Sequence, residues 1–292
     1  MAQQVELVLD ARALLGEGPS WHEGEQKLYW VDLEGQTLHC YDPATAQDQT
    51  WGLPEKIGCV VPRKAGGLVI SVESGLAFFE PRTGTQTLMC VPAAWRAETL
   101  PNDGKCDPAG RFWAGTKDAH EREPRGRLYC LHPDLTCQPM ETQITVSNGI
   151  TWNPAYTVMY YIDSPTLQVW AYDFDAAAGT IANRRVVIRV PPAMGFPDGM
   201  TSDREGMLWI AHWGGWQVTR WEPRTGKLLA AYAVPARHTS SCCFGGADLR
   251  DLYITSARVR VPADDLPHYP QAGGLFRLRT DVPGLETFYF EG

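Results

Sequence analysis

A pattern of short segments recurs six times along this chain of 292 residues. Each unit opens on a polar or Gly-containing segment and continues through three or four runs of alternating apolar and polar residues, which is typical of β-strands separated by turns. Corresponding positions lie 42, 43, 46, 50 and 43 residues apart; they are Glu17, Cys59, Asn102, Asn148, Asp198 and Ser241. A repeat of about 40–45 residues is typical of a four-stranded propeller blade.

A turn sequence that recurs at matched positions supports the repeat. Asp107 to Gly110 leads into an aromatic-rich run in the same way as Asp203 to Gly206. The sixth unit is one strand short, and the strand-like segment Val5 to Leu9 can supply its outer strand and close the ring. We therefore predict an all-β fold, a six-bladed β-propeller with four strands per blade, as one domain over residues 1–292. A β-sandwich would explain the strands but not the repeat.

Composition narrows the class of partner. The formal net charge is −8 without a basic patch, which argues against nucleic acid as a partner. No apolar run approaches the length of about 18 residues that crosses a membrane. The first residues have neither a basic start nor a long apolar run, so we expect a cytoplasmic protein. The eight cysteines include no Cys-x-x-Cys pair and are expected to be buried thiols rather than disulfides.

Polar residues stand directly ahead of the expected first strands in four of the six units. They are Glu17, Asn102 with Asp103, Asn148, and Asp198. Turn propensity explains each one singly, because Asp and Gly favour turns. It does not explain why oxygen-bearing side chains recur at one position of the repeat. In a propeller the first strand of each blade lines the central channel, so these side chains would gather at one mouth.

This set of side chains has the chemistry of a cation site. The carboxylates of Glu17 and Asp198 and the amide oxygen of Asn148 would give oxygen ligands with a charge of −2. Such ligands suit a divalent cation whose coordination is completed by water. His22 and His212 fall at other positions of the repeat, which argues against a zinc site built on histidine.

The order of these motifs over nearly the whole chain resembles the family of senescence marker protein, regucalcin and gluconolactonase. Each motif alone is short and weak, but the ordered set is specific. The motifs that carry the resemblance are Gly16-Glu17-Gly18-Pro19, Asn102-Asp103-Gly104-Lys105, Asp107 to Arg111 with Ala114-Gly115-Thr116, Ser147-Asn148-Gly149, Tyr160 to Ser164, Asn183-Arg184-Arg185, Pro197 to Met200, Thr239 to Gly246 and Ala272-Gly273-Gly274.

The resemblance implies a six-bladed propeller that hydrolyses sugar lactones with one bound divalent metal ion. It implies that Glu17, Asn148 and Asp198 are the metal ligands and that Asp198 is also the general base. It places Asn102 against metal-bound water or substrate, with Asp103 beside it in the pocket. Calcium, zinc, manganese, magnesium and iron(II) can each occupy a site of this kind. The expected partner is a small sugar lactone, and the expected assembly is a monomer or weak oligomer.

The chain departs from the animal members of this family at two positions. They have a basic residue where this chain has Leu100, and an acidic residue in the loop after Ala-Gly-Thr where this chain has His120. Both positions line the substrate side of the pocket in the family, so His120 is a predicted substrate contact. The expected reaction is hydrolysis of an aldonolactone, such as glucono- or xylonolactone, to the free acid. The alternatives are a non-catalytic calcium-binding propeller and a paraoxonase-like esterase with two calcium ions.

Overall fold

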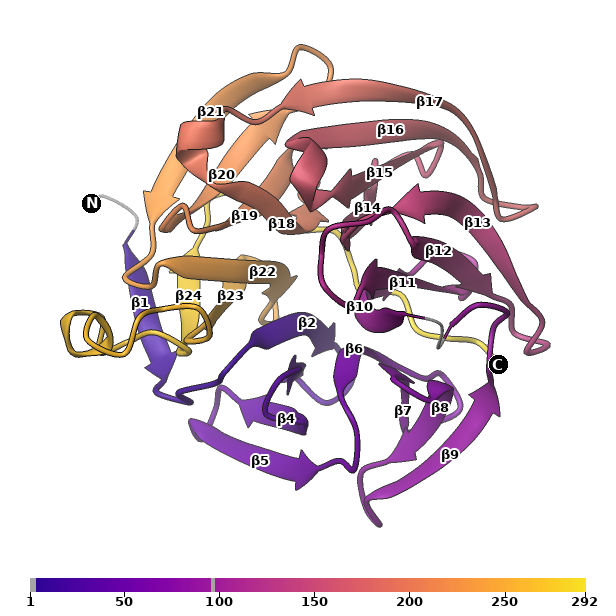
Figure 1. The fold of residues 1–292 in the computed structure, drawn as a ribbon, viewed down its shortest axis with the longest axis horizontal. Coiled ribbons are helices and arrows are strands. Elements are labelled where there is room, and N and C mark those ends of the chain that lie inside the picture. Colours follow the sequence, from indigo (N-terminus) through magenta and orange to yellow (C-terminus); the bar gives the residue numbers. More distant parts are fainter. Residues whose placement is uncertain (1–3, 96–97) are drawn as a thin grey trace.

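The fold is a ring of six four-stranded antiparallel sheets around a central axis (Figure 1). It is seen in a computed structural model, which describes residues 4–95 and 98–292. Within those ranges the helical elements are three single 3-10 turns, η1 (Ser164–Thr166), η2 (Pro192–Met194) and η3 (Leu266–His268). The six-bladed propeller predicted from the repeat is confirmed. Across the same ranges, no helix has the length and apolar character needed to span a membrane.

Five of the sheets take their strands in chain order, beginning with the strand nearest the axis. Blade 1 consists of β2 (Gly16–His22), β3 (Lys27–Asp32), β4 (Thr37–Asp42) and β5 (Gln47–Gly52). Blade 2 consists of β6 (Ile57–Pro62), β7 (Leu68–Val72), β8 (Gly75–Glu80) and β9 (Thr85–Cys90). Blade 3 consists of β10 (Thr99–Cys106), β11 (Phe112–Asp118), β12 (Gly126–Leu131) and β13 (Cys137–Ile144).

The next two blades follow the same order of strands. Blade 4 consists of β14 (Ser147–Trp152), β15 (Val158–Asp163), β16 (Gln168–Asp175) and β17 (Thr180–Arg189). Blade 5 consists of β18 (Phe196–Ser202), β19 (Leu208–Trp213), β20 (Gln217–Glu222) and β21 (Lys227–Ala233). The inner strands of successive blades therefore all run in the same direction along the axis.

Blade 6 joins the two ends of the chain, as the sequence predicts. Its strands are β22 (His238–Gly245), β23 (Asp251–Ala257), β24 (Leu275–Arg279) and, outermost, β1 (Val5–Leu9). The pairing of β1 with β24 is antiparallel and places Leu7 opposite Phe276. Leu7 also packs on the apolar cluster between blades 5 and 6. Strand β1 therefore closes the ring and covers the edge of β24.

Deleting residues 1–9 should lower the free energy of unfolding by about 3 kcal/mol or more, because the apolar contacts of β1 are lost and the edge of β24 is exposed. Urea denaturation measures this loss. Glu6→Gln is the matched control, since it removes only the charge of the carboxylate that Arg277 contacts through Nε at 2.7 Å and Nη2 at 2.5 Å. An exposed ion pair contributes less than about 1 kcal/mol. Equal midpoints for the deletion and the intact chain would contradict this account of ring closure.

The core lies between neighbouring blades and is rich in aromatic side chains. Two of these aromatic side chains are hydrogen-bonded to the aspartates of the recurring Asp-x-x-Gly turns. Trp113 Nε1 donates to Asp107 Oδ2 and Trp209 Nε1 donates to Asp203 Oδ2, both at 2.9 Å. Each of these buried carboxylates is also paired with an arginine, because Arg111 Nε donates to Asp107 Oδ2 at 2.6 Å and Arg220 Nε donates to Asp203 Oδ2 at 2.8 Å. All eight cysteines lie in the described ranges, and all are free thiols, as predicted; six are buried, but Cys90 and Cys137 are only partly buried.

The segment after β24 crosses the ring and contacts several blades (Figure 1). Its backbone donates from Leu285 to the Ser202 carbonyl at 3.2 Å, from Phe290 to the Pro62 carbonyl at 2.9 Å, and from Glu291 to the Gly110 carbonyl at 3.1 Å. The phenyl ring of Phe290 is fully buried.

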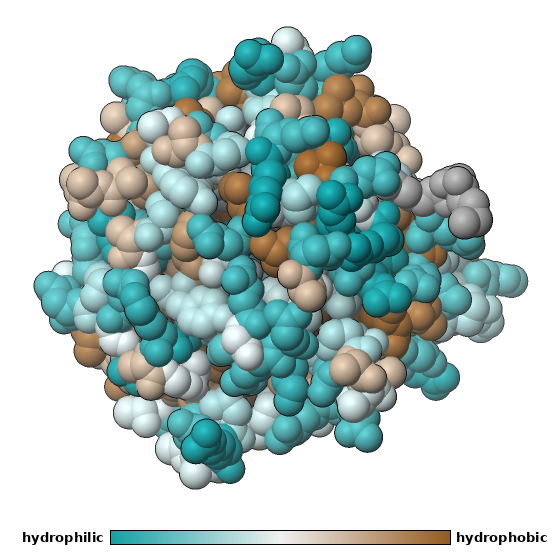
Figure 2. Space-filling view, turned by 180° about the vertical axis from the view of Figure 1, so that it is seen from behind, coloured by the Kyte–Doolittle hydropathy of each residue, from teal (hydrophilic) through white to brown (hydrophobic). Residues whose placement is uncertain are grey.

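On the face shown in Figure 2, hydrophilic residues predominate and apolar atoms form small separate areas.

Candidate metal and lactone site

Every inner strand has an irregular register near its start. In β2 the shift lies between Glu17 and Ser20, in β14 it follows Asn148, and in β18 it lies between Pro197 and Met200. A β-bulge of this kind re-aims the side chains around it. The sequence places Glu17, Asn148 and Asp198 in loops ahead of these strands, whereas the structure places them inside the strands, at the bulges. The prediction of loops was wrong because residues with turn propensity here form bulges.

The glycines that follow Asn148 and Asp198 permit close approach of neighbouring inner strands. A Cβ on Gly199 would lie 2.0 Å from Ser241 Oγ, and one on Gly149 would lie 2.5 Å from the Cβ of Met200. Neither glycine has a positive φ. Gly199 is therefore required by packing against the next blade, not by the tight turn that Pro-Asp-Gly favours.

Gly199→Ala should lower the free energy of unfolding by about 1–3 kcal/mol, because the added methyl group has no room beside Ser241. Asp198 precedes it in the same bulge, so activity should fall as well. Gly52→Ala is the matched control, since a Cβ there would meet nothing within 4 Å. Chemical denaturation of the two variants checks the difference. A Gly199 variant as stable as the Gly52 variant would show that the blades can move apart at this point.

A cavity of about 400 Å³ opens at the end of the axis where the inner strands begin. It brings together the three predicted metal ligands and Asn102. The residues that line it are Leu15, Glu17, Glu34, Asn102, Lys117, Glu121, Val146, Asn148, Ser164, Pro165, Phe196, Asp198, Trp213, Val259 and Arg260. Its volume is in the range of small-molecule sites.

A chain of hydrogen bonds orients the amide side chains in this cavity. Asn102 Nδ2 donates to Asn148 Oδ1 at 3.1 Å and to the Ser147 carbonyl at 2.6 Å. Asn148 Nδ2 donates to Ser164 Oγ at 2.8 Å, and that hydroxyl donates to the Pro197 carbonyl at 2.7 Å. The network joins blades 3, 4 and 5 and fixes which end of the Asn148 amide is oxygen. Because an amide oxygen has two lone pairs, Asn148 Oδ1 retains one acceptor position.

The two carboxylates predicted as metal ligands lack the full set of partners that buried charges require; among the described residues, Glu17 accepts one hydrogen bond, from the Gly18 backbone to Oε2 at 3.3 Å. Glu17 and Asp198 are only 6% and 5% exposed. Burial, and then the charge of Asp103, raise the pKa of Glu17 to about 8. Burial and the nearby charge of Glu17 raise the pKa of Asp198 well above its ordinary value. Asp198 Oδ1 has no hydrogen-bond partner within the described chain. Buried ionised carboxylates are unfavourable unless a cation compensates them.

These residues fit a divalent cation of the oxygen-preferring kind. The orphaned oxygen of Asp198, the buried carboxylate of Glu17 and the free acceptor position of Asn148 face a shared cavity. Such a cation needs further oxygen ligands, which water can supply. Within the described part of the chain, no three His, Cys, Asp or Glu side chains are grouped for metal binding. A site here therefore depends on the amide of Asn148 as well as on the two carboxylates.

Asp103 and His120 do not line the cavity. Asp103 is buried and its Oδ1 accepts from the Gly104 backbone at 2.8 Å. His120 is exposed, and its backbone donates to Asp118 Oδ2 at 3.2 Å. The turn organised by Asp118 presents the next residue, Glu121, to the cavity instead. The acidic residue of this loop is thus displaced by one position from where the resemblance locates it.

Sequence reasoning missed the basic side chains of the cavity. Lys117 follows Ala-Gly-Thr directly. A lysine near the end of an otherwise buried strand indicates a charged group at the mouth of the ring, and this was the sequence signal for it. Arg260 lies in the irregular segment after β23, which carries no strand pattern. Trp213 also lines the cavity, but its indole stacks on the His238 ring with centroids 4.2 Å apart.

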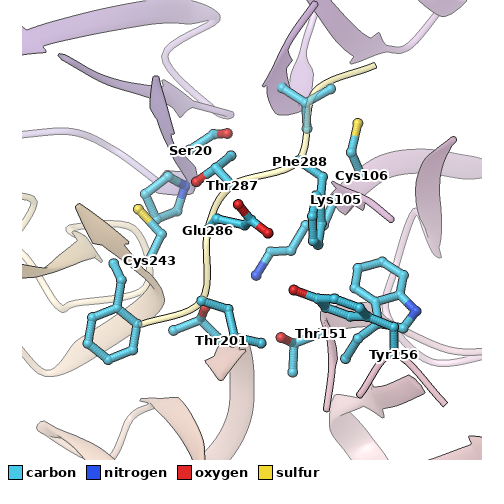
Figure 3. A pocket seen from close by; sticks show the side chains of 16 residues that line it. Ser20, Lys105, Cys106, Thr151, Tyr156, Thr201, Cys243, Glu286, Thr287 and Phe288 are labelled. Carbon is cyan, nitrogen blue, oxygen red and sulfur yellow. The ribbon is translucent and has the colours of Figure 1, made fainter. Parts of the chain in front are cut away.

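A second, smaller cavity of about 50 Å³ lies where the inner strands end. The C-terminal segment passes over it and contributes Glu286 to its lining (Figure 3). The Lys105 and Glu286 side chains both enter this cavity from its wall. Lys105 Nζ donates to the Met200 carbonyl at 2.9 Å. The C-terminal segment therefore covers the axis at the end opposite the carboxylates.

Comparison with known proteins identifies the family to which the chain belongs. The family described as "SMP-30/Gluconolactonase/LRE-like region" matches residues 15–258. Regucalcin of Danio rerio is 39% identical over 292 residues, with 99% of each chain covered. A Bacillus subtilis protein provisionally named sugar lactone lactonase YvrE is 34% identical over 286 residues, with 98% of each chain covered.

Solved structures agree with the sequence comparison. A calcium-binding protein, regucalcin, from Agrobacterium tumefaciens superposes with a TM-score of 0.94 at 26% identity, covering 100% of this chain and 98% of that one. A luciferin-regenerating enzyme superposes with a TM-score of 0.92 at 28% identity, with both chains fully covered. The chain therefore belongs to the SMP-30/gluconolactonase family, as the resemblance of its motifs predicts.

Proposed function

We propose that this protein hydrolyses the lactone of a sugar acid, such as glucono- or xylonolactone, to the free acid with the help of one divalent cation. The observation that carries the proposal is the convergence of Glu17, Asn148 and Asp198 in one cavity, with Asp198 Oδ1 unpartnered. The lactonase names in the family and among its relatives support the same reaction.

Each side chain has a distinct role in this proposal. Glu17, Asn148 and Asp198 would hold the cation, which when bound would polarise the lactone carbonyl and lower the pKa of a water molecule. Asp198 accepts a proton from the attacking water as general base. The water oxygen adds to the carbonyl carbon, the bond from that carbon to the ring oxygen breaks, and the ring oxygen takes up the proton that Asp198 accepted, directly or through water. Asn102 is positioned to orient the water or a sugar hydroxyl.

The test is a panel of lactones and metals. Protein stripped by a chelator is assayed alone and then with calcium, magnesium, manganese, zinc or iron(II), against glucono-, galactono-, xylono- and arabinonolactone. We expect no turnover above the spontaneous rate without metal, and turnover of at least one lactone with at least one metal. Calcium binding without turnover of any lactone would overturn the proposal in favour of a calcium-binding role, the property stated for the Agrobacterium neighbour.

A further inference from the structure

A second group of charged side chains lies in the cavity beside the carboxylates that would hold a cation, and the charge of Lys117 partly offsets the rise in the pKa of both Glu17 and Asp198. Lys117 is the penultimate residue of β11 in blade 3, Glu121 follows in the next turn, and Arg260 comes from the segment after β23 in blade 6. Lys117 Nζ lies 3.0 Å from Glu121 Oε1, and Arg260 Nη1 lies 2.8 Å from Glu121 Oε2. One carboxylate therefore joins two cations from different blades.

The members of this triad differ in exposure. The side chain of Lys117 is 8% exposed, whereas that of Arg260 is 62% exposed. Lys117 therefore belongs to the cavity wall and Arg260 to its mouth. Burial by itself would raise the pKa of Glu121, but the charge of Lys117 and the contacts with Arg260 outweigh it and lower that pKa. The triad consequently holds two positive charges and one negative charge at neutral pH.

The remaining charges of the cavity balance one another once a divalent cation is bound. Glu17 and Asp198 would be neutralised by that cation. Glu34 is paired with Lys56, whose Nζ lies 2.7 Å from Glu34 Oε2. The triad is left with one positive charge in excess, and its lysine is almost fully buried. Because the single carboxylate of Glu121 is shared between a buried lysine and an arginine at the mouth, a ligand that supplies a second negative charge to both would be favoured.

We propose that the preferred lactone carries an anionic substituent, which Lys117 binds with the help of Arg260. The inference rests on the proposed function, because it concerns the same cavity. Among the described residues, Glu121 is the carboxylate that each of these cations contacts, and both cations have further N–H donors. The anion can be the second carboxylate of a sugar diacid lactone or the phosphate of a phosphorylated sugar lactone. Charge-assisted hydrogen bonds of this kind give both affinity and discrimination.

The test compares charged and uncharged lactones in the metal-loaded protein. The substrates are glucono-1,5-lactone, glucaro-1,4-lactone and 6-phosphogluconolactone, and the variants are Lys117→Met and Lys64→Met. We expect at least one anionic lactone to have a kcat/KM about tenfold or more above gluconolactone, with the advantage falling as salt is raised. Lys117→Met should remove that advantage, mainly through KM, so that anionic and neutral lactones have similar kcat/KM values in this variant. Lys64→Met is the matched control, since Lys64 lies outside the cavity and pairs with Glu291.

Binding of the open-chain acids separates this inference from the proposed function. Calorimetry should show glucarate or 6-phosphogluconate binding more tightly than gluconate in the wild type but not in Lys117→Met. If that binding preference holds while no lactone turns over, the proposed lactonase activity fails and the anion site stands. If gluconolactone is the best substrate, or Lys117→Met lowers turnover of charged and uncharged lactones equally, the anion site is overturned and the lactonase stands.

Discussion

Asp198→Asn is expected to lower kcat/KM for the best lactone by about a thousandfold or more, because in the proposed function this one carboxylate serves both as cation ligand and as base. The substitution keeps the size of the side chain, so the fold should persist. The metal-free variant should be more stable than the metal-free wild type at pH 8, since a buried carboxylate without a partner has been removed. Far-ultraviolet circular dichroism and thermal unfolding check both points.

Glu17→Gln separates the two roles of Asp198. This substitution weakens the proposed cation site but leaves the proposed base in place. Saturating metal should therefore restore much of the activity of Glu17→Gln but not that of Asp198→Asn. A cation favours the ionised form of a carboxylate that binds it, which makes that carboxylate a weaker base. Recovery of Asp198→Asn at high metal concentration would show that Asp198 is a ligand only and that the base lies elsewhere.

The metal-free protein should become less stable as the pH rises from about 4.5 to about 8. In the unfolded chain Glu17 loses its proton near the ordinary value of 4.5, whereas in the folded chain its pKa is about 8. Over this interval the folded state retains a proton that the unfolded state has lost, so stability falls with rising pH, by on the order of a few kcal/mol. Asp198 shifts in the same direction.

Chemical denaturation in the presence of a chelator, at intervals from pH 5 to about 8.5, measures this slope. Added cation should stabilise the protein more at pH 8 than at pH 5, because it favours the ionised carboxylates. Glu17→Gln is the control and should have a flatter profile, since the titrating group is gone. A stability that rises with pH in the metal-free wild type would show that these carboxylates are compensated by the chain itself.

The fold could be predicted because similar strand and turn segments recur at regular spacing along the sequence. The same spacing placed Glu17, Asn148 and Asp198 at one end of the axis. What it could not show was the bulge at each inner strand, because Pro-Asp-Gly favours a turn as readily as a bulge. The close contact of Gly199 with Ser241 depends on the next blade and has no local signal.

Contacts between segments that are distant in the sequence could not be predicted either. Arg260 meets Glu121 across the cavity from another blade, and neither position has a distinctive motif. Glu121, and not His120, points into the cavity because of the turn around Asp118. The C-terminal segment lacks strand periodicity, so its passage over the end of the axis could not be foreseen.

The initial rate of lactone hydrolysis, followed as metal is titrated into stripped protein of known concentration, tests the central claim most directly. The rate should rise from the spontaneous background in proportion to added metal and reach a plateau at one ion per chain, and Asp198→Asn should remain at background throughout. Hydrolysis at full rate without metal, or a plateau only at two ions per chain, would contradict a single cation held by Glu17, Asn148 and Asp198.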